Sequence, residues 1–112
     1  LDREGVSIGI PAGIVSPRWY DVDVRGEANH AGSTPMSGRR DAVCTFARTC
    51  SCIQDRPAAE AAVVGTVGEV VVTPNSRNVV PGHVHFTIDI RGWDVARTDM
   101  VCSDVEAALE RI

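Results

Sequence analysis

One histidine stands at the centre of a short polar segment whose neighbouring residues have little side-chain bulk. Residues 26–36 read GEANHAGSTPM, with His30 in the middle. Glycine lacks a Cβ and alanine adds little, so backbone or a ligand can approach this imidazole closely. Pro35 fixes its own φ and pushes Thr34 towards an extended conformation, which stiffens the segment. A stiff polar loop that presents one imidazole is typical of a functional site, and an ordinary surface loop is the alternative interpretation.

The other two histidines lie close together in the sequence. His83 and His85 fall on the same face of a strand-like segment and could bind one ion as a pair. A solvated polar face is the favoured interpretation. Three histidines are too few and too badly arranged for a two-metal site. We therefore expect no metal site in these 112 residues.

The four cysteines do not form a metal or redox motif. Cys44, Cys50 and Cys52 lie in one helix-like segment and Cys102 lies in another, and none has the C-x-x-C spacing. We interpret them as small buried hydrophobic residues in a reducing cytosol.

Composition narrows the class of protein. A chain of 112 residues with 44% hydrophobic and 23% charged residues is ordinary for one folded, soluble domain. The net charge of −4 argues against a nucleic-acid partner. No apolar run approaches the roughly 20 residues of a membrane helix, and there is no signal peptide, so we expect a cytoplasmic protein without a membrane partner. Leu1 in place of Met indicates a fragment of a longer chain.

Four segments have the composition of β-strands. Residues 6–15 are rich in β-branched side chains but are interrupted by proline and glycine, which predicts a broken edge strand. Residues 19–25 and 83–91 alternate apolar and polar side chains, which predicts strands with one wet face. Residues 63–73 indicate a long strand whose two glycines mark bulges or close approaches.

Two segments have helical spacing. Residues 39–54 should form a helix with Ser37 as its N-cap and Asp41 in its first turn, and Pro57 should end it. Asp94 should cap a second helix. The expected buried stripe of the first helix is Val43, Phe46, Ala47, Cys50 and Ile53, and that of the second is Val101, Val105, Ala108 and Ile112.

The predicted order is β-α-β-β-α, one strand short of the ferredoxin-like β-α-β-β-α-β unit. The sequence therefore predicts an α+β, ferredoxin-like two-layer sandwich, with two helices on one face of an antiparallel sheet. The last strand is missing. Either the chain is cut short, or residues 6–15 supply a substitute edge.

Four motifs in this order carry a family resemblance: residues 26–36, then RRDA at 39–42, PNSRNVVPG at 74–82 and DIR at 89–91. Together they resemble the small lid, or dimerisation, domain of the two-zinc amidohydrolase and exopeptidase family. The resemblance is closest to N-carbamoyl-L-amino-acid hydrolases, with allantoate amidohydrolases and β-ureidopropionases next. It covers nearly the whole chain, which implies that residues 1–112 are a lid domain without its catalytic domain.

The resemblance also implies roles for single residues. His30 matches a histidine that reaches into the partner subunit's active site and helps to polarise the scissile amide carbonyl, as an oxyanion donor does. Asn78 matches an asparagine that hydrogen-bonds the substrate, and Arg91 matches an arginine that clamps its carboxylate. By residue type alone, both would be ordinary surface residues. Three further positions match backbone near the substrate: Gly32, Ser33 and Thr34.

For the whole enzyme, the resemblance implies a homodimer that cleaves N-carbamoyl-amino acids or related ureido acids bearing a carboxylate. Two divalent ions, zinc or manganese, and a glutamate base would belong to the absent catalytic domain of the same chain, and the lid would also meet that of the partner subunit. The fragment alone should hydrolyse nothing. The alternatives are the lid of a related dipeptidase or desuccinylase, and a stand-alone ferredoxin-like binding module.

Overall fold

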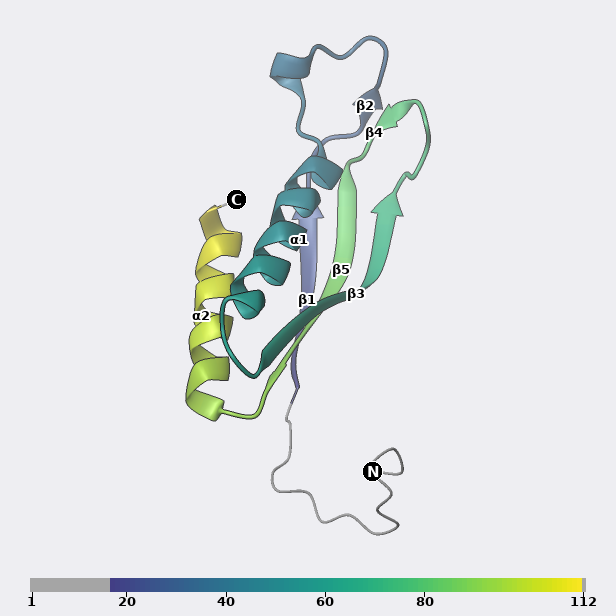
Figure 1. Cartoon of the computed structure of the whole chain (residues 1–112). Helices are drawn as coiled ribbons and strands as arrows, with labels where there is room; N and C mark the ends of the chain where they lie inside the picture. Colours follow the sequence, from purple (N-terminus) through teal and green to yellow (C-terminus); the bar gives the residue numbers. More distant parts are fainter. Residues whose placement is uncertain (1–16, 112) are drawn as a thin grey trace, which may run out of the picture.

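The computed structural model describes residues 17–111, which form a sheet with two helices on one face (Figure 1). The elements in chain order are β1 (Arg18–Arg25), β2 (Asn29–His30), the short 3₁₀ helix η2 (Met36–Gly38), α1 (Ala42–Ala58), β3 (Val63–Thr73), β4 (Val79–Val80), β5 (His83–Gly92) and α2 (Val95–Arg111). The predicted α+β two-layer architecture is confirmed. The expected strand over residues 6–15 lies outside the described residues.

The main sheet has the order β1-β5-β3, and both pairings are antiparallel. Strands β1 and β3 therefore run parallel, with β5 inserted between them, which is the split β-α-β arrangement. A strand that continued from α2 in the same pattern would pair with the outer edge of β1. The register of β3 shifts between Val67 and Val70, so Gly68 lies in the predicted bulge.

The alternation of β5 divides the sheet into a core face and an open face. Phe86 is fully buried and packs edge-on against Phe46 of α1, with ring centroids 4.8 Å apart. Helix α2 adds Val101 and Val105 to this core, as predicted. The residues of β5 between the buried ones face the open side, and they are His83, His85, Thr87, Asp89 and Arg91.

Helix α1 begins three residues later than predicted. Asp41, and not Ser37, is its N-cap, because Asp41 Oδ1 accepts hydrogen bonds from the amides of Val43 (2.9 Å) and Cys44 (3.3 Å). Ser37 lies in η2 instead. Pro57 does not end the helix, which continues to Ala58. The next amides still donate to carbonyls of the last turn, so proline removes only one bond.

The expectation of buried cysteines is only partly right. Cys102 is buried, whereas Cys50 and Cys52 are half-buried and Cys44 is exposed. Cys44 belongs to an exposed stripe of α1 that also holds Ala47, Arg48 and Ser51 at helical spacing. Ala47, predicted in the buried stripe, is therefore also on the wet side. All four thiols are free.

Two predictions for the second helix have different outcomes. Asp94 Oδ1 accepts the amide of Arg97 at 3.1 Å, as an N-cap does. Ala108 is half-buried, and Ile112 lies outside the described residues. Between residues 17 and 111, no helix is both long and apolar enough to cross a bilayer.

Candidate functional site

A second, two-stranded sheet brings His30 and Asn78 together. In the β2–β4 pair, His30 lies opposite Val79 and Asn29 lies opposite Val80. The amide of Ala31 donates to the carbonyl of Asn78 at 2.9 Å. Figure 1 shows this pair beyond the end of the main sheet, with the segment that follows β2 arching away from it. Both candidate side chains are exposed, so a ligand can reach them.

Backbone contacts tie this small sheet to the main body. The amide of Gly26 donates to the carbonyl of Gly82 (2.8 Å), and the amide of Ala42 donates to that of Pro81 (3.0 Å). A side chain at position 26 would run into the carbonyl oxygen of Arg40, so only glycine fits there. The ends of β1, α1 and β5 thus meet at one junction, which carries the His30 loop.

The loop is also braced from within. Thr34 Oγ1 donates to the carbonyl of His30 at 2.6 Å, and the amide of Gly32 donates to His30 Nδ1 at 3.0 Å. The imidazole is exposed and does not pack against the main sheet. It is therefore held by its own loop in a position open to a ligand.

Arg39 is a structural residue that the sequence motif did not assign. Its half-buried guanidinium donates from Nε to the carbonyl of Thr34 (3.1 Å) and from Nη2 to the carbonyl of Ala31 (2.7 Å). A planar fork of donors suits two carbonyls at once. The sequence offered no signal for this role, because Arg39 and its exposed neighbour Arg40 have the same residue type.

Arg91 lies at the opposite end of β5 from the β2–β4 pair. A strand rises about 3.3 Å per residue, so His83 and Arg91 are separated by roughly 26 Å along β5. His30 lies on the His83 side of that strand, because β4 leads directly into β5. The resemblance groups His30, Asn78 and Arg91 around one substrate, but a single chain does not bring Arg91 to the same small molecule as the other two.

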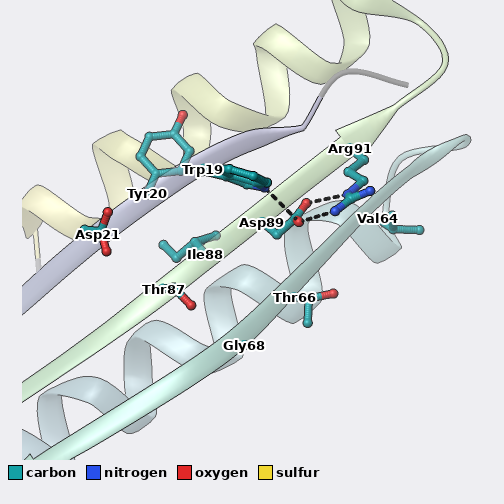
Figure 2. Close-up of a pocket in the computed structure, with 10 residues that line it drawn as sticks. All are labelled: Trp19, Tyr20, Asp21, Val64, Thr66, Gly68, Thr87, Ile88, Asp89 and Arg91. Carbon is teal, nitrogen blue, oxygen red and sulfur yellow. Dashed lines mark hydrogen bonds and ion pairs between the residues drawn. The ribbon is translucent and has the colours of Figure 1, made fainter. Parts of the chain in front are cut away.

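Arg91 is held by an acid of its own strand (Figure 2). Its Nε and Nη2 donate to the two oxygens of Asp89 at 2.8 and 2.6 Å, and Trp19 Nε1 donates to the same carboxylate at 3.1 Å. The pKa of Asp89 is lowered, chiefly by the hydrogen bonds from Arg91, with partial burial opposing and Trp19 adding to the shift. These two hydrogen bonds leave Nη1 of the guanidinium unused.

A hollow of about 640 Å³ lies beside this arginine on the open face of the sheet (Figure 2). Trp19 and Val64 give it apolar walls and are 74% and 63% exposed. Thr66 and Thr87 add hydroxyl groups, Arg91 adds a positive charge, and Asp21 and Asp89 add carboxylates. Arg91 is the group of this lining that can bind a carboxylate, and the apolar walls can contact an apolar part of the same molecule.

The second histidine pair is engaged with acids of β1. Asp23 Oδ1 lies 2.7 Å from His83 Nε2 and 3.2 Å from His85 Nδ1, and His85 Nε2 lies 3.4 Å from Asp21 Oδ1. Hydrogen bonds from His83 and then His85 lower the pKa of Asp23. Across residues 17–111, no three histidine, cysteine or acidic side chains are arranged to hold a metal ion.

Removing the Arg39 clamp should loosen the loop. In Arg39→Ala, the free energy of unfolding should fall by about 1–3 kcal/mol, since two carbonyls lose a charged donor. Hydrogen exchange of the Ala31 amide, which bonds to Asn78, should accelerate as well. Arg40→Ala is the matched control, because that side chain is exposed and makes no hydrogen bond or ion pair within the described part of the chain. Equal exchange rates in the two variants would contradict the bracing role.

The Asp89–Arg91 pair should be visible in the titration of the acid. A folded-state pKa below the ordinary value near 3.9 stabilises the fold above that pH, and this stability is lost as the pH falls through the lowered pKa. In Arg91→Gln, the midpoint of Asp89, followed by its carboxyl ¹³C shift, should rise towards the ordinary value. An unchanged midpoint would show that Arg91 does not set it.

Known proteins resemble this chain in sequence and in fold. Residues 15–112 match the family described as the peptidase dimerisation domain. The chain is 45% identical over 97 residues to allantoate amidohydrolase of Escherichia coli (strain K12), covering 86% of this chain and 24% of that protein. It is 35% identical over 112 residues to N-carbamoyl-L-amino acid amidohydrolase of Geobacillus stearothermophilus, covering 100% of this chain and 27% of that protein.

A solved structure of a related amidase has the same fold over this region. The hydantoinase/carbamoylase family amidase from Burkholderia ambifaria superposes with a TM-score of 0.86 at 36% identity, covering 98% of this chain and 27% of that one. The chain thus spans about a quarter of the length of the relatives that it matches. On this evidence the chain belongs to the peptidase dimerisation domain family.

Proposed function

We propose that this chain is the lid and dimerisation domain of a metal-dependent amidohydrolase that cleaves N-carbamoyl-amino acids or related ureido acids. The observation that carries the proposal is the division of its polar groups. His30 and Asn78 occupy one end of the domain, and Arg91 with its hollow occupies the other. The names of the relatives, N-carbamoyl-L-amino acid and allantoate amidohydrolase, support the substrate class.

Two copies of the domain could together supply His30 and Arg91 to one substrate, although these residues lie at opposite ends of each copy. Within the described residues, β3 is paired only on its β5 side, so its outer edge is open over eleven residues. Val64, Val70 and Val71 of this strand are exposed. An open edge with apolar side chains suits pairing with its own copy about a two-fold axis.

Antiparallel pairing of two β3 edges brings unlike ends together. Val64, near the start of β3, lies opposite Arg91. Thr73, at the end of β3, lies at the junction with β4, where its carbonyl accepts the amide of Gly82 at 3.0 Å. The start of one β3 would face the end of the other. Arg91 of one protomer then shares a substrate with His30 of the partner subunit.

Each group then has one task. The free Nη1 edge of Arg91 binds the substrate carboxylate, and the hollow between Trp19 and Val64 takes its side chain. His30 and Asn78 donate hydrogen bonds to the carbonyl oxygen, whose negative charge grows as the tetrahedral intermediate forms. The divalent ions, zinc or manganese, and the general base come with a catalytic domain, and this chain alone is inactive.

A dipeptidase or desuccinylase lid and a stand-alone binding module are the alternatives. Arg91 would bind the carboxylate of a dipeptide equally well, so the clamp does not discriminate between these substrates. A panel of N-carbamoyl-L-amino acids, allantoate, dipeptides and N-succinyl acids, assayed with the intact hydrolase, decides the substrate class. Turnover of dipeptides in place of the carbamoyl and ureido acids would overturn the proposal.

The two ends should show different kinetic defects in the intact hydrolase. His30→Ala should lower kcat by about 10²–10³, the usual effect of losing one oxyanion donor, with metal content unchanged. Arg91→Ala should mainly raise KM, because its contact exists before and during the transition state. Arg48→Ala, an exposed arginine of α1, is the control. Full turnover in His30→Ala would contradict the role given to the loop.

A charged side chain introduced on β3 tests whether this strand is the dimer interface. Val71→Asp in the intact hydrolase should place a carboxylate on each of the two paired β3 edges and shift the protein to monomers, measured by light scattering after size-exclusion chromatography. Val95→Asp changes another exposed valine, on α2, and should leave the dimer intact. A stable Val71→Asp dimer would show that β3 is not the interface.

A further inference from the structure

The hydrogen bond to the ring of His30 determines which ring nitrogen carries the proton. The amide of Gly32 donates to His30 Nδ1 at 3.0 Å. A backbone N–H can only donate, so Nδ1 must be the acceptor and holds no proton. In the neutral ring, the single proton then lies on Nε2, because the partner of one nitrogen fixes the role of the other.

The second ring nitrogen is available to a ligand. Over residues 17–111, Nε2 of His30 has no hydrogen-bond partner, and the side chain is exposed. The backbone at position 32 also lies close to the ring. A Cβ at position 32 would lie 3.1 Å from His30 Cε1, tighter than ordinary packing, so glycine lets the amide approach without displacing the ring.

The loop that carries the amide is itself fixed. Thr34 Oγ1 binds the carbonyl of His30, and Arg39 Nη2 binds the carbonyl of Ala31. The carbonyl of Ala31 and the amide of Gly32 belong to one peptide unit, so the Arg39 contact fixes that unit directly and the Thr34 contact fixes the unit before it. The ring nitrogen and the amide therefore keep their mutual orientation.

We propose that the backbone amide of Gly32 is a positioning group that presents His30 as an Nε2–H donor. His30 then gives a hydrogen bond to the substrate carbonyl oxygen and does not take up a proton from the attacking water. This inference rests on the proposed function for the use of the donor, but not for its orientation. A general-base role would require Nε2 to be the unprotonated nitrogen, which the Gly32 contact opposes.

The donor role is tested by two side chains of equal length in the intact hydrolase. Gln carries an N–H donor at the end of its side chain, whereas Glu carries only acceptor oxygens when ionised. His30→Gln should retain about tenfold more kcat than His30→Ala, and His30→Glu should be no better than His30→Ala. If His30→Glu equals or exceeds His30→Gln, the histidine acts as a base and the proposal is wrong.

The tautomer itself is read from the ring nitrogens. In the ¹⁵N-histidine-labelled 112-residue chain at about pH 8.5, where an unperturbed imidazole is neutral, two-bond ¹H–¹⁵N correlations show which nitrogen is protonated. His30→Gln identifies the His30 signals among those of the three histidines. A protonated Nε2 and an unprotonated Nδ1 are expected, and a protonated Nδ1 would overturn the inference.

Two substitutions of Gly32 distinguish the loss of its N–H donor from the steric effect of an added Cβ on the His30 ring. Gly32→Pro removes the N–H, and Gly32→Ala keeps it while adding a Cβ. Only the proline variant should give a mixture of ring tautomers. If both variants keep Nε2–H alone, the amide does not fix the ring. If the intact hydrolase turned over none of the carbamoyl and ureido substrates, the proposed function would fail, and these nitrogen signals would still decide the role of Gly32.

Discussion

The antiparallel pairing of β5 with strands on both sides is the constraint on which the rest of the structure depends. One face of β5 supplies Phe86 and its apolar neighbours to the core, which gives the two helices a surface to cover. The other face carries the polar groups. Because the strand is extended and paired on both sides, its two ends are held apart, and the candidate groups at those ends do not meet within one chain.

Because His30 and Arg91 are far apart in one chain, the proposed function requires a second protomer. A small acid that needs both a carboxylate clamp and an oxyanion donor must receive them from two protomers. In the proposed dimer, the open edge of β3 would provide the means, since antiparallel pairing would bring the Arg91 end of one copy to the His30 end of the other. Under this proposal, catalysis would depend on dimerisation.

The two ends are built in different ways. Arg91 stands on the main sheet and is held by Asp89, so its position follows from the strand. His30 stands on a two-residue ladder that has little buried surface of its own. Its order depends on polar contacts, chiefly the Arg39 clamp and the Gly32 amide. The position of His30 should therefore be more sensitive than that of Arg91 to single substitutions nearby.

Much of the fold could be predicted because its signals are local. The alternation of residues 83–91 and the spacing of apolar residues in α2 depend only on strand and helix periods. The start of α1 was missed because two residues, Ser37 and Asp41, have good capping side chains. The choice is made by a distant contact, the bond from Ala42 to the carbonyl of Pro81. The β2–β4 pair was missed for a similar reason, since a two-residue ladder is too short to show a period.

The candidate site was harder to predict than the fold. The residue types of His30, Asn78 and Arg91 were identified through motif resemblance, but their distribution over two ends follows from strand pairing alone. Arg39 has the same residue type as its exposed neighbour Arg40, so no local pattern distinguishes the clamp from a surface residue.

The central claim is that His30 and Arg91 serve one substrate only across two protomers. Mixing the His30→Ala and Arg91→Ala versions of the intact hydrolase tests it most directly, with subunit exchange and at a substrate concentration too low to saturate the Arg91→Ala sites. In a mixed dimer, one site then lacks both groups and the other lacks neither, so random mixing should restore about a quarter of the wild-type activity. If both groups came from the same chain, every site would keep one defect. Mixing would then restore no activity, and the account would be contradicted.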